Sequence, residues 1–257
     1  MCRIFFIMNT KNKKEKIMNF LSQSTHKVKN TPGVDNSYEN SRHLDGFGFS
    51  WISGKQWKTY KSPVLHVNDA HFEKQVPSIV KSHIIIGHIR NKIYGNASKE
   101  NTHPFFFKNQ VFFHNGFVKD FMKHKSAIMG KINKKYHSHI KGETDSECLF
   151  YLFLTIKDMV YSPSMVDQSM VEQSMVDVSK LFFQTLKDMK LTCLVNIVFA
   201  DEKYVVISRY SILQKPTNKD SNLSLYYDNT DGIVISSEPI TDNYKLFPEN
   251  SILIMEY

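Results

Sequence analysis

The chain opens with MCRIFFIM (1–8), a cysteine placed directly before a short apolar run. Residues 3–8 are mostly branched or aromatic and include no turn former, a pattern typical of a buried strand. Aminopeptidases accept a small second side chain, so removal of Met1 would make Cys2 the N-terminal residue. Its α-amine, with an ordinary pKa of about 7.7–8.0, could then take the thiol proton near neutral pH. Cys2 is therefore a candidate nucleophile, although cysteine at position 2 also occurs by chance.

The remaining apolar patterns predict strands toward both ends of the chain and helices between them. Further strands are expected at 45–51, 83–90, 110–116, 193–200, 204–210, 224–227, 232–238 and 252–256. A helix is expected from Ser146 to about Met159. Thr144 and Glu147 have the spacing of a capping box at its start. This order of elements favours an α+β fold, with two sheets in one domain and the helices outside.

A second helix is expected over about Val178–Lys190, with Leu181, Phe182, Leu186 and Met189 facing inward. A five-residue repeat, SMVDQ, SMVEQ and SMVDV (164–178), precedes it. Three copies are too short for a solenoid. We interpret the repeat as an expanded loop inserted at about 161–178, or as a helical extension, with no catalytic role.

The bulk composition excludes several classes of protein. With 257 residues, 41% of them hydrophobic, the chain can bury a substantial core. No apolar run approaches the roughly 18 residues that cross a bilayer, and the opening residues have the wrong charge order for a signal peptide. Cys2, Cys148 and Cys193 are too few and too far apart for a disulfide framework or a zinc site. We therefore expect a cytoplasmic protein with no membrane contact, no metal and no cofactor.

The net charge of +8 raises the possibility of nucleic-acid binding. The lysines concentrate at 11–16 and 119–141, and neither stretch interleaves them with stacking aromatic residues. A solvated surface is favoured over a nucleic-acid groove, and no nucleic-acid partner is expected.

Two short motifs at predicted strand ends carry residues suited to amide chemistry. In GHIR (87–90), Arg90 could bind a carboxylate through two parallel hydrogen bonds, or it could form a surface ion pair. In FFHNG (112–116), the Asn115 amide and the Gly116 N–H could donate to one oxygen, as an oxyanion hole requires. An Asn-Gly pair is equally typical of a hairpin turn.

A third motif, GETDSE (142–147), places Asp145 at a predicted helix start. A carboxylate there could accept hydrogen bonds from the ammonium group of a ligand. On local grounds it is more typical of a helix cap.

Taken together, eight segments resemble the type II glutamine amidotransferase domain of the N-terminal nucleophile hydrolase superfamily. The segments are MCRI, DGFGFSW (45–51), GHIR, NTHPF (101–105), FFHNG, GETDSE, SRY (208–210) and SSEP (236–239). NTHPF, TDSE and SSEP are similar to the stand-alone branch that contains γ-glutamyl hydrolases of glutathione breakdown and ergothioneine synthesis. The resemblance covers essentially the whole chain except the repeat, and it implies a four-layer αββα fold over residues 2–257.

The resemblance also implies roles for individual residues. Cys2 would attack the side-chain amide carbonyl of glutamine or a γ-glutamyl compound and form a thioester. Asn115 and Gly116 would hold the oxyanion, Arg90 the α-carboxylate and Asp145 the α-ammonium. Water, or an acceptor in a separate acceptor or peptidase subunit, would release the thioester.

The resemblance further implies that Thr102 and His103 shape the pocket wall and transfer no proton. One position departs from the family pattern, because Ile93 stands where a threonine would help to bind the carboxylate. This departure leaves open a changed substrate, or a catalytically silent binding module with the same fold.

Overall fold

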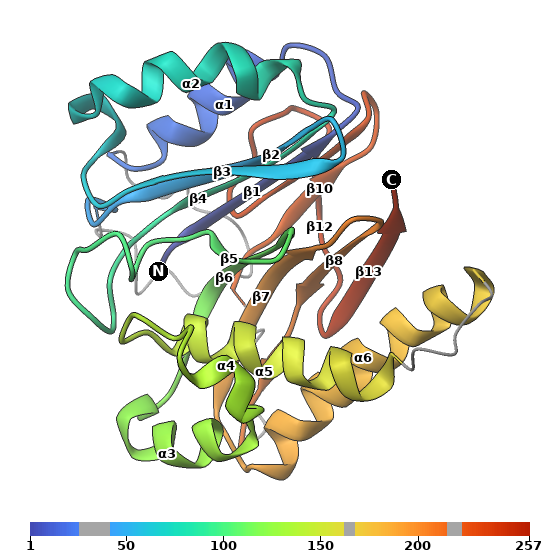
Figure 1. Ribbon diagram of the computed structural model, residues 1–257. Coiled ribbons are helices and arrows are strands. Elements are labelled where there is room, and N and C mark those ends of the chain that lie inside the picture. Colours follow the sequence, from blue (N-terminus) through green and yellow to red (C-terminus); the bar gives the residue numbers. More distant parts are fainter. Residues whose placement is uncertain (26–41, 162–167, 215–222) are drawn as a thin grey trace.

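The computed structural model describes residues 1–25, 42–161, 168–214 and 223–257 (Figure 1). Its strands form two antiparallel sheets that lie face to face, with helices on both outer sides (Figure 1). This is the four-layer αββα arrangement that the resemblance implies.

The first sheet has seven strands in the order β12-β10-β11-β1-β4-β2-β3, and two helices cover its outer face (Figure 1). Its strands are β1 (Arg3–Met8), β2 (Phe47–Ser53), β3 (Gln56–Ser62), β4 (Ile84–Ile89), β10 (Tyr226–Asp228), β11 (Ile233–Ser236) and β12 (Lys245–Leu246). The helices are α1 (Lys13–Ser22) and α2 (Ala70–Lys81), the latter preceded by a 3-10 turn at His66–Asn68.

The second sheet has the order β13-β8-β7-β6-β5, with the short β9 paired to β7. Its strands are β5 (Phe105–Phe107), β6 (Gln110–Val118), β7 (Cys193–Ala200), β8 (Tyr204–Arg209), β9 (Ser211–Ile212) and β13 (Ser251–Glu256). Four helices lie on its outer side (Figure 1). They are α3 (Phe121–Lys131), α4 (Lys134–His137), α5 (Asp145–Val160) and α6 (Gln168–Asp188).

Alternation along β1 shows how the strands divide the core. Ile4 and Phe6 belong to the cluster between the two sheets, whereas Phe5 and Ile7 pack beneath α1 and α2. Side chains on a strand point alternately to opposite faces. The same alternation therefore turns Cys2 inward, toward the second sheet, and Arg3 outward.

Helix α5 forms where the sequence predicts a helix, and it is buried around most of its circumference. All its residues from Asp145 to Ile156 are buried, because the helix packs against β6, α3 and α6. A helix that is apolar around most of its circumference is typical of such an enclosed position. The capping prediction is confirmed at one of its two bonds, since the Thr144 hydroxyl accepts from the Glu147 N–H at 3.2 Å. The Glu147 carboxylate instead accepts from the N–H groups of Lys141 and Gly142.

Helix α6 contains most of the five-residue repeat. Residues 168–178 form its first half, so the helical extension is the interpretation that holds there, while 162–167 lie outside the described residues. Phe182 and Leu186 are fully buried as expected, but Leu181 is 39% exposed. The prediction for Leu181 is wrong because the buried face runs through Phe183 instead.

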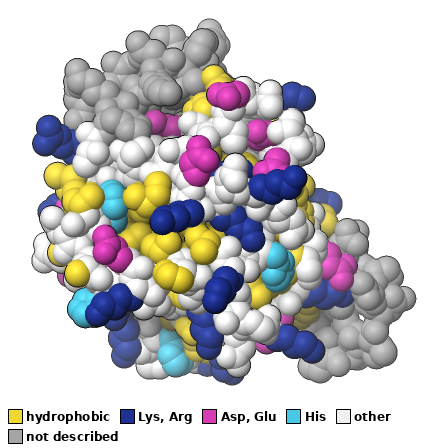
Figure 2. Space-filling model, turned by 90° about the horizontal axis from the view of Figure 1, so that it is seen from above, with side chains coloured by type: hydrophobic (Ala, Val, Ile, Leu, Met, Phe, Trp, Pro, Cys, Tyr) yellow, Lys and Arg dark blue, Asp and Glu magenta, His cyan; other side chains and the backbone are white. Residues whose placement is uncertain are grey.

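The lysine-rich segments lie on the surface. In the stretch 119–141 every lysine is exposed except Lys125, which is half-buried. On the face formed by α1 and α2, basic side chains are scattered among acidic and hydrophobic ones (Figure 2). Within the described ranges, no helix is both long and apolar enough to cross a membrane.

Candidate functional site

Cys2 lies immediately before β1 and contacts the chain that follows β4. Its thiol is 3.4 Å from both the carbonyl oxygen and the amide nitrogen of Asn91. Burial and the nearby Asp145 carboxylate raise the pKa of this thiol, while the Asn91 hydrogen bond, the Met1 amine and Arg90 lower it. A thiol in this position needs a base to become a nucleophile.

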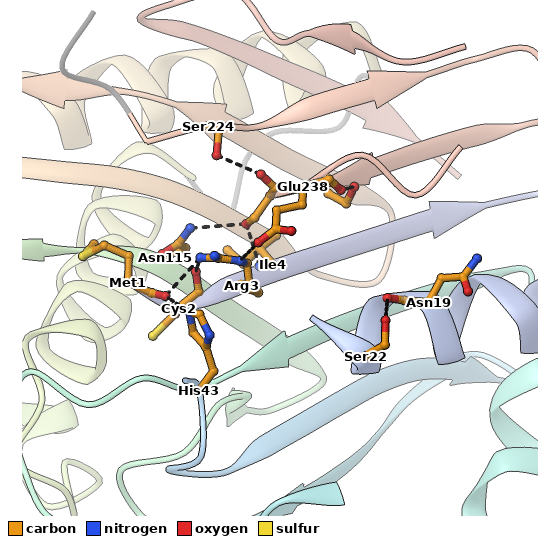
Figure 3. A network of polar contacts seen from close by, with 12 residues as sticks. Met1, Cys2, Arg3, Ile4, Asn19, Ser22, His43, Asn115, Ser224 and Glu238 are labelled. Atoms are coloured by element: carbon orange, nitrogen blue, oxygen red, sulfur yellow. Dashed lines mark hydrogen bonds and ion pairs between the residues drawn. The ribbon is translucent and has the colours of Figure 1, made fainter. Parts of the chain in front are cut away.

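Polar contacts surround the first three residues of the chain, which here retains Met1. Met1 is buried, and its carbonyl oxygen contacts the His43 Nε2 and accepts from Arg3 Nη1 at 3.2 Å (Figure 3). The same Arg3 nitrogen donates to the Cys2 carbonyl, and Arg3 Nε forms a buried ion pair of 2.6 Å with Glu238 (Figure 3). Burial lowers the pKa of the Met1 amine below its ordinary 8.0.

Asn115 lies within β6, where it is paired with Asn196 of β7. The hairpin-turn alternative for Asn115-Gly116 is therefore wrong, because the strand continues through both residues to Val118. Asn115 follows Val111 and Phe113 on the face between the sheets. Its Nδ2 donates to the Ser237 hydroxyl at 3.3 Å (Figure 3).

The Gly116 N–H points toward an open edge of β6. Gly116 pairs with Val195 of β7, but the Val195 N–H donates in the other direction, to Tyr210. In an antiparallel ladder, both residues of such a pair direct their N–H groups away from each other. On this side the neighbouring strand β5 pairs with β6 only at residues 110–112.

Close packing on the opposite face explains why position 116 is a glycine. A Cβ atom at Gly116 would lie 1.8 Å from the Leu194 carbonyl oxygen and 2.6 Å from the His114 Nε2. These two groups are themselves hydrogen-bonded at 3.0 Å, so the space is fully occupied.

Arg90 follows β4 directly and is buried among backbone carbonyl groups. Its Nη1 donates to Asn96 at 3.0 Å and Asp45 at 3.4 Å, and its Nη2 donates to Tyr94 at 3.0 Å and Gly95 at 3.2 Å. The guanidinium group therefore fixes the loop at 91–96.

Ile93 lies in this loop and is 50% exposed. Its side chain therefore faces solvent to a large extent, in contrast to the buried Arg90 guanidinium.

Asp145 is the first residue of α5 and joins this helix to β6. Its Oδ2 accepts from the Val118 N–H at 2.8 Å, and its Oδ1 accepts from the Ser146 N–H at 2.7 Å. The cap is supplied by Thr144, so Asp145 is not the capping residue.

Thr102 and His103 are both buried beside this region. The Thr102 hydroxyl donates to the Ser98 carbonyl at 2.7 Å. The His103 ring lies 4.0 Å, centre to centre, from the His88 ring, and burial lowers the pKa of both, so both are neutral. That Thr102 and His103 transfer no proton stays a prediction.

Sequence reasoning missed four residues of this region. His43 had no motif to mark it, and Arg3 appeared only as part of a strand. Ser237 and Glu238 stand in the SSEP motif, but nothing local connects them to residues more than 100 positions away. Within the described residues no group of three or more His, Cys, Asp or Glu side chains could hold a metal ion.

The chain is similar to known glutamine amidotransferases. Residues 19–245 match the family model of class II glutamine amidotransferases. The protein described as "Probable glutamine amidotransferase DUG3" of Saccharomyces cerevisiae is 28% identical over 210 residues. That match spans 68% of this chain and 58% of the yeast protein's length.

Solved structures show the same fold at low identity. A glutamine aminotransferase class-II domain protein from Silicibacter pomeroyi aligns with a TM-score of 0.55 at 19% identity, covering 98% of this chain and 94% of the other. The glutamine phosphoribosylpyrophosphate amidotransferase of B. subtilis aligns with a TM-score of 0.58 at 15% identity. That alignment covers 100% of this chain and 47% of the B. subtilis chain.

Proposed function

The chain belongs to the class II glutamine amidotransferase family, and on this premise we propose that it hydrolyses the side-chain amide of glutamine or a γ-glutamyl compound. Cys2 is the nucleophile after removal of Met1. The observation that supports the proposal is the link from the Asn115 amide through the Ser237 hydroxyl to the Ile4 N–H, because it holds Asn115 beside β1, the strand that Cys2 precedes.

The reaction begins when the free α-amine of Cys2 takes the thiol proton. The thiolate attacks the amide carbonyl, and the developing oxyanion is stabilised by the N–H groups of Asn115 and Gly116. The C–N bond then breaks, and the proton passes from the amine to the leaving nitrogen. Ammonia or an amine departs and leaves a thioester on Cys2.

Water attacks the thioester and releases a carboxylic acid, which regenerates the thiol. The α-amine of Cys2 acts as the base for this water, because it is the group nearest to the sulfur that can accept a proton. A separate acceptor or peptidase subunit could use the departing nitrogen compound.

In this proposal the α-amino acid end of the substrate is bound by Arg90 and Asp145. Both lie beside strand ends that meet near Cys2, and Arg90 favours the Cys2 thiolate electrostatically. The existing contacts of both side chains hold them in place, so the substrate must share them. Thr102 and His103 line the same region.

Intact mass spectrometry tests the nucleophile directly. Purified protein should lack the mass of Met1 and should gain one adduct of 6-diazo-5-oxo-norleucine, a glutamine-analogue electrophile. Cys2→Ala should give no adduct and no glutamine or γ-glutamyl hydrolysis. Cys148→Ala and Cys193→Ala are matched controls because both thiols are buried in the core, and both variants should still be labelled. An adduct on Cys2→Ala protein would refute the assignment.

A further inference from the structure

The SSEP motif (236–239) has no role in the reaction proposed above, but the structure places two of its side chains around Cys2. Ile235 of β11 points between the sheets and Val234 points beneath the outer helices. Alternation then directs Ser237 inward and Glu238 outward. The Ser237 hydroxyl contacts the Asn115 amide. The Glu238 carboxylate contacts Arg3 (Figure 3).

Ser237 is fixed from several sides. Its N–H donates to the Ile4 carbonyl at 2.9 Å, and its hydroxyl oxygen accepts from the Ile4 N–H at 2.8 Å. Its carbonyl accepts from the Ser224 hydroxyl at 2.8 Å. Ser237 therefore has a defined position relative to β1, the strand that Cys2 precedes.

The hydrogen bond from Asn115 to Ser237 leaves two groups unused in this contact, the hydroxyl hydrogen of Ser237 and the Oδ1 of Asn115. Asn115 Nδ2 and the Ile4 N–H both donate to the Ser237 oxygen, which uses both of its lone pairs. The hydroxyl hydrogen then has no role in this contact. The Asn115 Oδ1 is buried and has no hydrogen-bond partner in the described part of the chain.

Turning the Asn115 amide by 180° would pair the Ser237 hydroxyl hydrogen with the Asn115 Oδ1. The Ser237 hydroxyl can then donate to Oδ1 while its oxygen still accepts from the Ile4 N–H. Both N–H groups of the amide become available on the side away from Ser237. In either orientation the amide makes one hydrogen bond with Ser237, but only the turned orientation pairs the acceptor Oδ1 with the hydroxyl and leaves both N–H groups for an anionic oxygen.

We propose that Ser237 is a positioning residue that holds the Asn115 amide with its N–H groups directed at the oxyanion. This inference rests on the proposed function, because it assumes that Asn115 stabilises the oxyanion. Ser237 contacts Asn115 and β1 but takes no part in the covalent steps.

The test compares Ser237→Ala with Ser224→Ala, which loses a hydrogen bond to the same residue but none to Asn115. Ser237→Ala should lower kcat for glutamine hydrolysis by about tenfold with KM unchanged, less than the roughly 10²–10³-fold effect of removing an oxyanion donor outright. Ser237→Thr, which keeps the hydroxyl, should restore most of the rate. Ser224→Ala should stay close to wild type.

A second measurement separates this role from general support of the fold. Alkylation of Cys2 by iodoacetamide forms no oxyanion, so Ser237→Ala should be alkylated at the wild-type rate. In an Asn115→Ala background, Ser237→Ala should cause no further loss of kcat, because the amide that it positions is absent. If Ser237→Ala fails to fold, Ser237→Cys can replace it, because cysteine has a similar shape and forms a weaker hydrogen bond. Ser237→Cys is expected to lower kcat and to leave KM and the alkylation rate unchanged.

Three results would overturn the inference: an unchanged kcat in Ser237→Ala, equal losses in hydrolysis and alkylation, or losses that multiply with Asn115→Ala. These outcomes differ from failure of the proposed function itself. In that case the wild-type protein would neither hydrolyse a glutamyl amide nor react with the glutamine analogue at Cys2.

Discussion

Alternation along three strands decides which side chains meet at the candidate site. Cys2 continues the inner face of Ile4, Asn115 that of Phe113, and Ser237 that of Ile235. A shift of one residue in any of these strands would turn its polar group toward the helices instead. The apolar residues that specify the core therefore also specify the orientation of the reactive groups.

Arg90→Lys and Asp145→Asn should both raise KM for glutamine or a γ-glutamyl compound. Lysine keeps the charge but loses the planar fork that now holds the 91–96 loop. Asparagine removes a charge and places an NH₂ group against donors at Val118 or Ser146. Each lost charge-assisted hydrogen bond corresponds to roughly 1.5–3 kcal/mol, or about ten- to more than a hundredfold in kcat/KM.

Steady-state kinetics beside a thermal melt checks both variants. If Arg90 only supports its loop, Arg90→Lys will lower Tm without changing KM. Ile93→Thr is a useful companion, because half of the Ile93 side chain is exposed and a direct effect on the substrate should be small. A large gain in glutamine turnover would show that position 93 contacts the substrate carboxylate.

The elements that the sequence predicts best are those buried on both sides. The bounds of β1 and β7 match their predicted ranges, and β4, β6, β8 and α5 are displaced by at most two residues. A strand buried on both faces is a continuous apolar run, which is visible without its neighbours. The sheet partners of these strands come from distant parts of the chain, so local patterns do not specify the strand order.

The helices of the first layer were missed because only a narrow face of each is apolar. Helix α1 buries only Ile17, Phe20 and Leu21 within a lysine-rich segment, so its pattern was interpreted as solvated surface. Helix α2 has a well-formed cap at Asp69, but Pro77 within it is a strong signal against a helix. The predicted order of strands, two helices and strands is therefore wrong, because α1 and α2 lie among the first strands and α3 and α4 precede α5.

Single residues of the candidate site can be predicted from the sequence. The contacts between these residues cannot. Cys2 and Asn115 can be named from motifs of a few residues. The contact between Asn115 and Ser237 joins residues 122 positions apart, and that between Arg3 and Glu238 joins residues 235 apart. Only the fold brings these pairs together.

Met175→Ala should destabilise the protein, because the repeat contributes to the core. Met175 is fully buried in the cluster between the second sheet and its helices, as is Val178. Truncation of a buried methionine lowers the free energy of unfolding by about 2–5 kcal/mol. Met159→Ala is a matched control since Met159 is 73% exposed. Denaturant titration would contradict the placement of α6 if the two variants had equal midpoints.

Strand β1, at the start of the chain, lies in the first sheet between β4 and β11, which comes from the C-terminal part of the chain. Every residue from Phe5 to Met8 pairs with a strand on each side. The segment that precedes Glu238 is therefore required to complete the layer that carries Cys2. The stability of the whole molecule and the position of Cys2 depend on the same set of contacts.

Glu238→Gln should lower the stability of the whole protein and disturb Cys2 at the same time. The change leaves the buried Arg3 guanidinium without the carboxylate 2.6 Å from its Nε, and breaking a buried ion pair costs about 3–5 kcal/mol. For a domain of this size the melting temperature should fall by roughly 6–20 °C. Asp120→Asn is a control that removes the exposed ion pair with Lys123, and it should leave the melting temperature unchanged. Because Arg3 also donates to the Cys2 carbonyl, alkylation of Cys2 by iodoacetamide should change in rate in Glu238→Gln at temperatures well below its melt. A variant that melts earlier but reacts at the wild-type rate would show that the ion pair stabilises the fold without positioning Cys2.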